Sequence, residues 1–192
     1  MQVPPLRRVA LLLALVVPAV SWAVVRPVRV VAPEWAAAGV SCTAGDVCVD
    51  DVSRLAEASG LYAEAQGFVA ARFGMPLQHP RVVFCATQAC ADAFGLGKRS
   101  AVTVGTAGTV IGPRAWKPFY VRHELIHQLQ GERFGVLGTL LKPGWLIEGM
   151  AYDLSEDPRP VLAEPWQGYR ARFRAWHAQV GDAGLWTAEA GR

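Results

Sequence analysis

The sequence predicts an α+β protein with one globular domain behind an N-terminal export segment. Patterns typical of strands and helices mix as far as residue 111, and the chain reads as helical from Phe119 onward. With 192 residues, of which 52% are hydrophobic, the chain can bury one core and is short for two. We therefore expect a small mixed sheet followed by a helical half, both within residues 26–192.

Local patterns predict the individual elements. Asp50 and Asp51 offer capping oxygens to a helix over 52–73, in which apolar residues recur at helical spacing. Two β-rich runs, 100–104 and 109–111, are separated by a glycine-containing segment and predict a hairpin. The other expected elements are strands over 28–31 and 81–86, a short helix over 88–94, and helices over 119–133, 143–154 and 165–180.

Residues 1–25 have the features of an export segment. A short basic stretch precedes the uncharged apolar run 9–25, and Ser21 and Ala23 place small residues where a signal peptidase cleaves. The run also reaches the lower length limit for a membrane span, so a cleaved signal peptide and an uncleaved membrane anchor are both open. In either case we expect the domain outside the cytoplasm, in the periplasm or anchored in the inner membrane.

The four cysteines agree with export. Cys42 and Cys48 lie close in sequence, as do Cys85 and Cys90, and disulfides persist in oxidising compartments. Two local bridges are the simplest of the three pairings that four cysteines allow. Neither pair has the Cys-x2-Cys spacing typical of a zinc knuckle.

The charge pattern argues against a nucleic-acid partner. The formal net charge is +3, and four arginines precede Glu34, the first acidic residue. Without the export segment the basic and acidic side chains of the domain are nearly equal in number. The domain therefore lacks the excess of positive charge that binding to nucleic-acid phosphates requires.

His123, Glu124 and His127 form an HExxH motif within a predicted helix. Residues four apart differ by only about 40° around a helix, so both imidazoles can bind one cation. Glu124 lies beside that face. It can therefore reach a water on the metal without being a ligand, as a general base must.

Glu148 is the candidate third ligand. It follows Pro143, which favours a helix start, and its neighbours are tryptophan, leucine, isoleucine, methionine and alanine. Burial of an unpaired carboxylate among such residues costs several kcal/mol, so a partner must neutralise it. A metal bound with His123 and His127 would do so, and a salt bridge to an arginine is the alternative.

These motifs resemble those of the gluzincin metallopeptidases, in particular the small bacterial peptidase MA-like proteins. The similarity covers about residues 80–180 and rests on HExxH followed by Trp145-x-x-Glu148-Gly149-x-Ala151. Arg133 occupies the place of the third histidine of metzincins. The resemblance implies one Zn²⁺ per chain, a peptide or protein substrate, and a strand near 109–111 that offers its edge to an extended substrate.

The resemblance also implies a tyrosine or histidine that stabilises the oxyanion. We favour Tyr169, with Tyr152 and His177 as alternatives. Asp153 is a candidate for orienting a ligand histidine. We place Glu156 and Asp157 in a solvated loop.

The predicted function is hydrolysis of peptide bonds, with Glu124 as the base. Two alternatives are an exported zinc-binding structural or assembly module without turnover, and a zinc hydrolase of a non-peptide amide. Structural zinc sites are closed by four protein ligands, whereas the motifs supply three, which favours an enzyme. The sequence leaves the oligomeric state open.

Overall fold

The computed structural model describes residues 24–187, with the exception of positions 38, 44 and 79. The predicted export segment therefore lies outside the described residues, apart from Val24 and Val25. Among the helices of the described part, none is long and apolar enough to cross a membrane.

A five-stranded mixed sheet forms the first half of the domain, as predicted. Its strands, in chain order, are β1 (Ser41–Cys42), β2 (Val47–Val49), β3 (Val82–Phe84), β4 (Ala101–Val104) and β5 (Gly108–Ile111). The order in space is β1-β2-β3-β5-β4. The three central strands run parallel, and the edge strands β1 and β4 pair antiparallel with their neighbours.

Both faces of the sheet are covered. Val82 and Phe84 lie in the larger core, against α3 (Leu55–Phe73) and α5 (Pro118–Phe134). Val83 lies between them in sequence and belongs to a second core with the residues of α4 (Gln88–Ala93). This alternation follows from the period of two along a strand and places α5 directly on the sheet.

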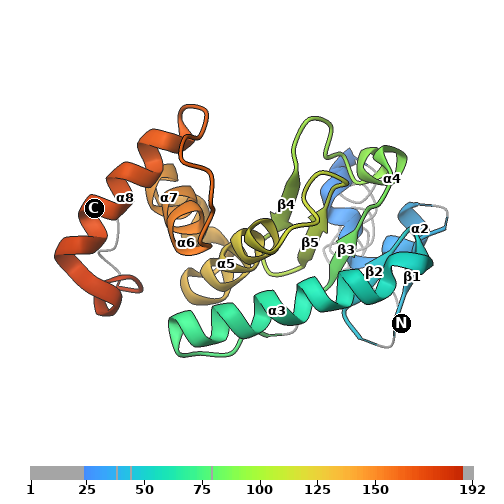
Figure 1. Cartoon of the computed structure of the whole chain (residues 1–192), viewed down its shortest axis with the longest axis horizontal. Helices are drawn as coiled ribbons and strands as arrows, with labels where there is room; N and C mark the ends of the chain where they lie inside the picture. The colour runs from blue at the N-terminus through green and yellow to red at the C-terminus, as the bar shows by residue number, and fades with distance from the viewer. Residues whose placement is uncertain (1–23, 38, 44, 79, 188–192) are drawn as a thin grey trace, which may run out of the picture.

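The helical half comprises α6 (Val136–Leu141), α7 (Gly144–Leu154) and α8 (Trp166–Gly184). Figure 1 shows these helices at one end of the molecule and the sheet toward the other, with α5 between them. Helical backbone in α8 is interrupted at Gly181, which has φ 64°, so the regular helix ends where the sequence predicts. The sequence does not predict α6, a six-residue helix with Gly138 inside it.

Two sequence predictions about strands are wrong. Residues 28–31 lie in a 3₁₀ helix, η1 (Arg26–Val31), because Pro27 fixes the backbone at its start and Val30 is buried in the second core without a strand partner. The expected substrate-binding edge is also misplaced. β5 lies between β3 and β4, so among the described residues the free edge beside α5 belongs to β4.

Most of the remaining local predictions hold, but the sequence predicts neither β1 nor β2, which carry Cys42 and Cys48. Of the two predicted capping residues, Asp51 accepts a hydrogen bond from the backbone nitrogen of Ser53 in η2 (Val52–Arg54), which leads into α3. Asp50 instead accepts from the backbone nitrogens of Ala86 and Thr87. Gly74 ends α3 with φ 68°, a left-handed conformation that glycine adopts readily. The predicted disulfides, Cys42–Cys48 and Cys85–Cys90, are both present.

Candidate metal site

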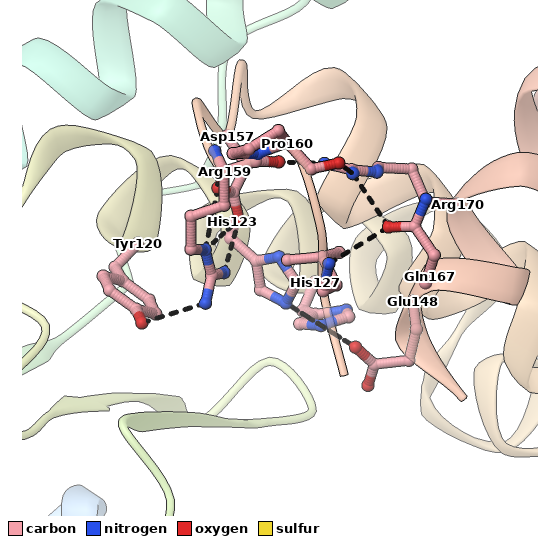
Figure 2. A network of polar contacts seen from close by, with 10 residues as sticks. Tyr120, His123, His127, Glu148, Asp157, Arg159, Pro160, Gln167 and Arg170 are labelled. Atoms are coloured by element: carbon pink, nitrogen blue, oxygen red, sulfur yellow. Dashed lines mark hydrogen bonds and ion pairs between the residues drawn. The ribbon is translucent and has the colours of Figure 1, made fainter. Parts of the chain in front are cut away.

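Two helices bring the three predicted ligands together. His123 and His127 lie one turn apart on α5, and Glu148 faces them from α7 (Figure 2). The two histidine Nε2 atoms are 3.1 Å apart, and Oε2 of Glu148 is 3.6 Å from each of them. His123 is 7% exposed, and the other two side chains are partly buried.

The spacing of these donor atoms fits a metal ion. Zinc bonds of about 2.0–2.2 Å in tetrahedral geometry place ligand atoms about 3.3–3.6 Å apart. The three separations in the structure lie at or near this range. Glu148 has both histidines as its partners and no arginine among the contacts of the described residues, so the salt-bridge alternative is not what the structure shows. The group can hold a metal ion with three protein ligands.

The position of α7 depends on a close contact with α8. Gly149 follows the candidate ligand, and a Cβ atom there would meet the backbone oxygen of Tyr169 and lie 2.7 Å from Cβ of Phe173. A larger residue would therefore push the two helices apart. This packing explains the glycine of the Glu148-Gly149 pair.

Gln130 fixes the orientation of one candidate ligand, His127. Its Nε2 donates to the backbone oxygen of Ile147 at 2.9 Å, which leaves Oε1 as the atom that faces Nδ1 of His127 at 2.8 Å. An amide oxygen only accepts, so Nδ1 of His127 carries the proton. In the neutral ring Nε2 then has a free lone pair, which is the tautomer that binds a metal through Nε2.

The site is electrostatically coupled. Burial alone would lower the pKa of His127, but its hydrogen bond to Glu148 and the charges of Glu148 and Glu124 raise the pKa to about 9. Burial would raise the pKa of Glu148, and its contacts with His123 and His127 instead hold that pKa well below its usual range. The negative charges of Glu148 and Glu124 therefore favour a proton on His127, and a metal cation at the same place could replace that proton.

Glu124 lies beside the ligand group and is not part of it. Its side chain is buried, with a relative exposure of 6%, and its Oε2 atom accepts a hydrogen bond from Oγ1 of Thr103 at 2.7 Å. No motif in the sequence marks Thr103 as a partner of Glu124. One feature of the sequence could have indicated it: Thr103 and Thr109 occupy matching positions of the predicted hairpin, and in the structure they lie on the face toward α5.

A cleft of about 660 Å³ opens over these residues. His123, Glu124, His127 and Glu148 all line it. Strand β4 forms one wall, and within the described chain it pairs with β5 alone. The cleft therefore contains the edge of β4, the carboxylate of Glu124 and a group of residues that could hold a metal ion.

The loop after α7 forms another wall. Asp157, predicted to be solvated, has a side chain that is only 1% exposed and forms an ion pair with Arg159. Arg159 also donates to the hydroxyl of Tyr120 at 3.2 Å (Figure 2). Asp157 and Arg159 both line the cleft. The buried Arg170 of α8 donates to the backbone oxygens of Arg159 and Pro160, which holds this loop in place.

The prediction that Asp157 is solvated is wrong, because it did not include Arg159 as a partner of the Asp157 carboxylate. Glu156, in contrast, is exposed.

The three candidates for oxyanion stabilisation lie in different places. The Tyr152 ring packs against His123, with centroids 4.4 Å apart, and lines the cleft. Burial and the charge of Glu148 raise the pKa of Tyr152 to about 12, so its hydroxyl stays protonated at neutral pH. Tyr169 packs against Gly144 and Trp166 and is not among the cleft residues. His177 contacts Asp182 away from the cleft. A catalytic role for Tyr169 stays a prediction.

The predicted role of Asp153 does not agree with the contacts. Its carboxylate accepts hydrogen bonds from Arg174 at 2.6 and 3.0 Å. The hydrogen-bond partner of His127 is Gln130, on the same helix three residues further on. An i, i+3 pair meets readily on a helix, and this position supplies the orienting oxygen.

Comparison of the chain with models of protein families, with curated proteins and with solved structures finds no match. The functional interpretation therefore depends on the geometry of the site and on its HExxH and Glu148 motifs.

Proposed function

We propose that the protein is an exported zinc-dependent peptidase of the gluzincin type, with one Zn²⁺ per chain on His123, His127 and Glu148. The observation that carries this proposal is the near-tetrahedral spacing of the three donor atoms in a cleft that also contains Glu124. A carboxylate that is buried beside the ligand group, and not part of it, is the arrangement that a general base requires.

The donor set favours zinc over magnesium or calcium. Two imidazole nitrogens and one carboxylate oxygen suit zinc, whereas magnesium and calcium prefer oxygen ligands. Three protein ligands leave one coordination position for water or substrate, as in catalytic zinc sites. Bound zinc supplies a Lewis acid that lowers the pKa of water toward ~7.

The protein's own residues supply the remaining steps. Glu124 accepts the proton of the attacking water and passes it to the amine nitrogen of the departing peptide. Tyr152 donates a hydrogen bond to the substrate carbonyl oxygen as negative charge develops on it. The free edge of β4 binds the backbone of an extended substrate through main-chain hydrogen bonds.

An extracytoplasmic location fits this function. The two disulfides indicate an oxidising compartment. Together with the basic and apolar pattern of residues 1–25, they support export by a signal peptide or by an anchor that retains the domain at the membrane.

A direct test combines metal analysis with digestion of a peptide library by the full-length chain. We expect one zinc per chain, cleavage products detectable by mass spectrometry, loss of cleavage after chelation and recovery after zinc is restored. Stoichiometric zinc without cleavage of any peptide or protein would instead support a structural site. Cleavage that persists in the metal-free protein would rule out the proposed mechanism.

A further inference from the structure

The general base is tied to the edge strand of the sheet. Oγ1 of Thr103, in β4, lies 2.7 Å from Oε2 of Glu124 and 3.0 Å from the backbone oxygen of the same residue. Thr103 is the hydrogen-bond partner that the structure gives to the Glu124 carboxylate within the described residues. The contact joins the strand that lines one wall of the cleft to the helix that carries the histidines.

A second threonine orders this contact. Thr109, in β5, is directly opposite Thr103 in the sheet, and the two Oγ1 atoms are 2.9 Å apart. Thr109 is fully buried, so its hydroxyl cannot turn to water for a partner. An ionised carboxylate only accepts hydrogen bonds, so Thr103 donates to Glu124 and its oxygen remains free to accept from Thr109. The order of donation is Thr109 to Thr103 to Glu124.

We propose that Thr103 is a positioning residue for the general base. It holds Oε2 of Glu124 in one place and leaves Oε1 to take the proton of the attacking water. Thr109 supports it, because a hydroxyl that accepts one hydrogen bond becomes a stronger donor in the next. This inference rests on the proposed function, in which Glu124 is the base.

The positioning role separates from metal binding. Thr103 contacts the carboxylate of Glu124, whereas the three donor atoms of the metal site come from His123, His127 and Glu148. Removal of the Thr103 hydroxyl should therefore leave the metal in place. It should weaken only those events in which Glu124 must receive a proton in a defined geometry.

The test uses Thr103→Val, which removes the hydroxyl and keeps the branched shape, and Thr103→Ser, which keeps the hydroxyl. Thr43→Val makes the same chemical change beside β1, at the opposite edge of the sheet, and serves as the control. Thr109→Val removes the donor to Thr103 and keeps the hydroxyl that contacts Glu124.

For the zinc-loaded full-length chain, kcat of Thr103→Val should fall about ten- to hundredfold with little change in KM, the range of one hydrogen bond to a charged group. Thr103→Ser should recover most of this loss, and Thr109→Val should show a smaller one. Zinc content should stay at the wild-type value in all variants, and Thr43→Val should match the wild type throughout.

A binding measurement provides a readout that does not depend on turnover. Acetohydroxamic acid loses a proton when it chelates zinc, and on this proposal Glu124 accepts that proton, whereas azide binds zinc without releasing a proton. By calorimetry, Thr103→Val should bind acetohydroxamic acid about tenfold or more weakly, with azide affinity unchanged. Thr103→Ser should bind both probes as the wild type does.

The outcomes separate this inference from the proposed function. If Glu124→Gln abolishes turnover but Thr103→Val keeps wild-type kcat and hydroxamate affinity, the positioning role is wrong and the peptidase remains. If Thr103→Val weakens both probes equally, or if Thr103→Ser is as impaired as Thr103→Val, Thr103 acts only as part of the fold. A wild-type chain that binds no zinc would overturn both proposals.

Discussion

Gln130 of α5 donates its side-chain amide to the backbone oxygen of Ile147, the residue before Glu148 on α7. The same side chain accepts a hydrogen bond from His127. One buried residue thus orients a candidate ligand histidine and sets the position of α7, which carries the candidate carboxylate ligand, relative to α5.

We expect Gln130→Met to weaken zinc binding about 10- to 100-fold, because it removes both hydrogen bonds and leaves the imidazole of His127 free to turn. Competition with a zinc chelator measures the affinity. Gln128→Met is the matched control, since Gln128 is equally buried on the same helix and bonds to Glu132 away from the site. Equal losses in the two variants would show that helix packing, and not orientation of His127, causes the effect.

Zinc should require all three ligands. Alanine at His123, His127 or Glu148 removes one of three donor atoms and should reduce the zinc content of the purified chain well below one equivalent. Glu132→Ala, on α5, removes a carboxylate outside the site and should keep full zinc. Metal analysis of folded variants decides the matter, and full zinc in Glu148→Ala would remove Glu148 from the ligand set.

Tyr152→Phe and Tyr169→Phe compare the two tyrosines by the same change. We expect Tyr152→Phe to lower kcat about 10²- to 10³-fold with little change in KM, because Tyr152 lies against His123 in the cleft and can bond the developing oxyanion. Tyr169→Phe should stay near the wild-type rate. The reverse result would assign the role to Tyr169, as the sequence alone suggested.

The ion pair between Asp157 and Arg159 in the cleft wall should make the thermal stability of the fold depend on pH. Burial alone would raise the pKa of Asp157, but hydrogen bonds from Arg159 bring it below its usual value. When the pKa of a carboxyl group is lower in the folded state, the group stabilises the fold at pH values above its unfolded-state pKa of about 3.9. This contribution is lost as the pH falls from that value through the lower folded-state pKa. Asp157→Asn should therefore lower the melting temperature at pH 7, and the difference from the wild type should shrink toward pH 3.

Thermal melts of both proteins across this range measure the effect. Arg159→Met provides the second arm, since the double variant should lose little more than either single variant if the two side chains act as a pair. A difference between wild type and Asp157→Asn that stays constant with pH would show that the carboxylate charge does not stabilise the fold.

Local signals predicted most of the fold. Residues 52–73 combine a capping aspartate with helical spacing and end at a glycine, and each of these features acts within the segment itself. The failures need information from elsewhere in the chain. The apolar alternation of 28–31 is also satisfied by a 3₁₀ helix buried on the second core, and the position of β4 at the edge depends on how β3 and β5 pair.

The ligand group was predictable for a similar reason. His123 and His127 share a helical face by spacing alone, and the surroundings of Glu148 demand a partner. The supporting residues were not predictable, because Thr103 reaches Glu124 across 21 positions and Arg159 holds Asp157 inside a loop that has no periodic pattern. The contact of Thr103 depends on tertiary packing, and the loop that carries Asp157 and Arg159 is held by Arg170 of α8, so no spacing rule encodes either.

Glu124→Gln tests the central claim most directly. The substitution keeps the shape of the side chain and removes the carboxylate that we propose accepts the proton, and Glu124 is not a member of the candidate ligand group. We therefore expect one zinc per chain and a melting temperature close to the wild type, with kcat reduced about 10²- to 10⁴-fold on a substrate found in the library digest. Wild-type turnover by the zinc-loaded Glu124→Gln chain would contradict the account, as would loss of zinc together with activity.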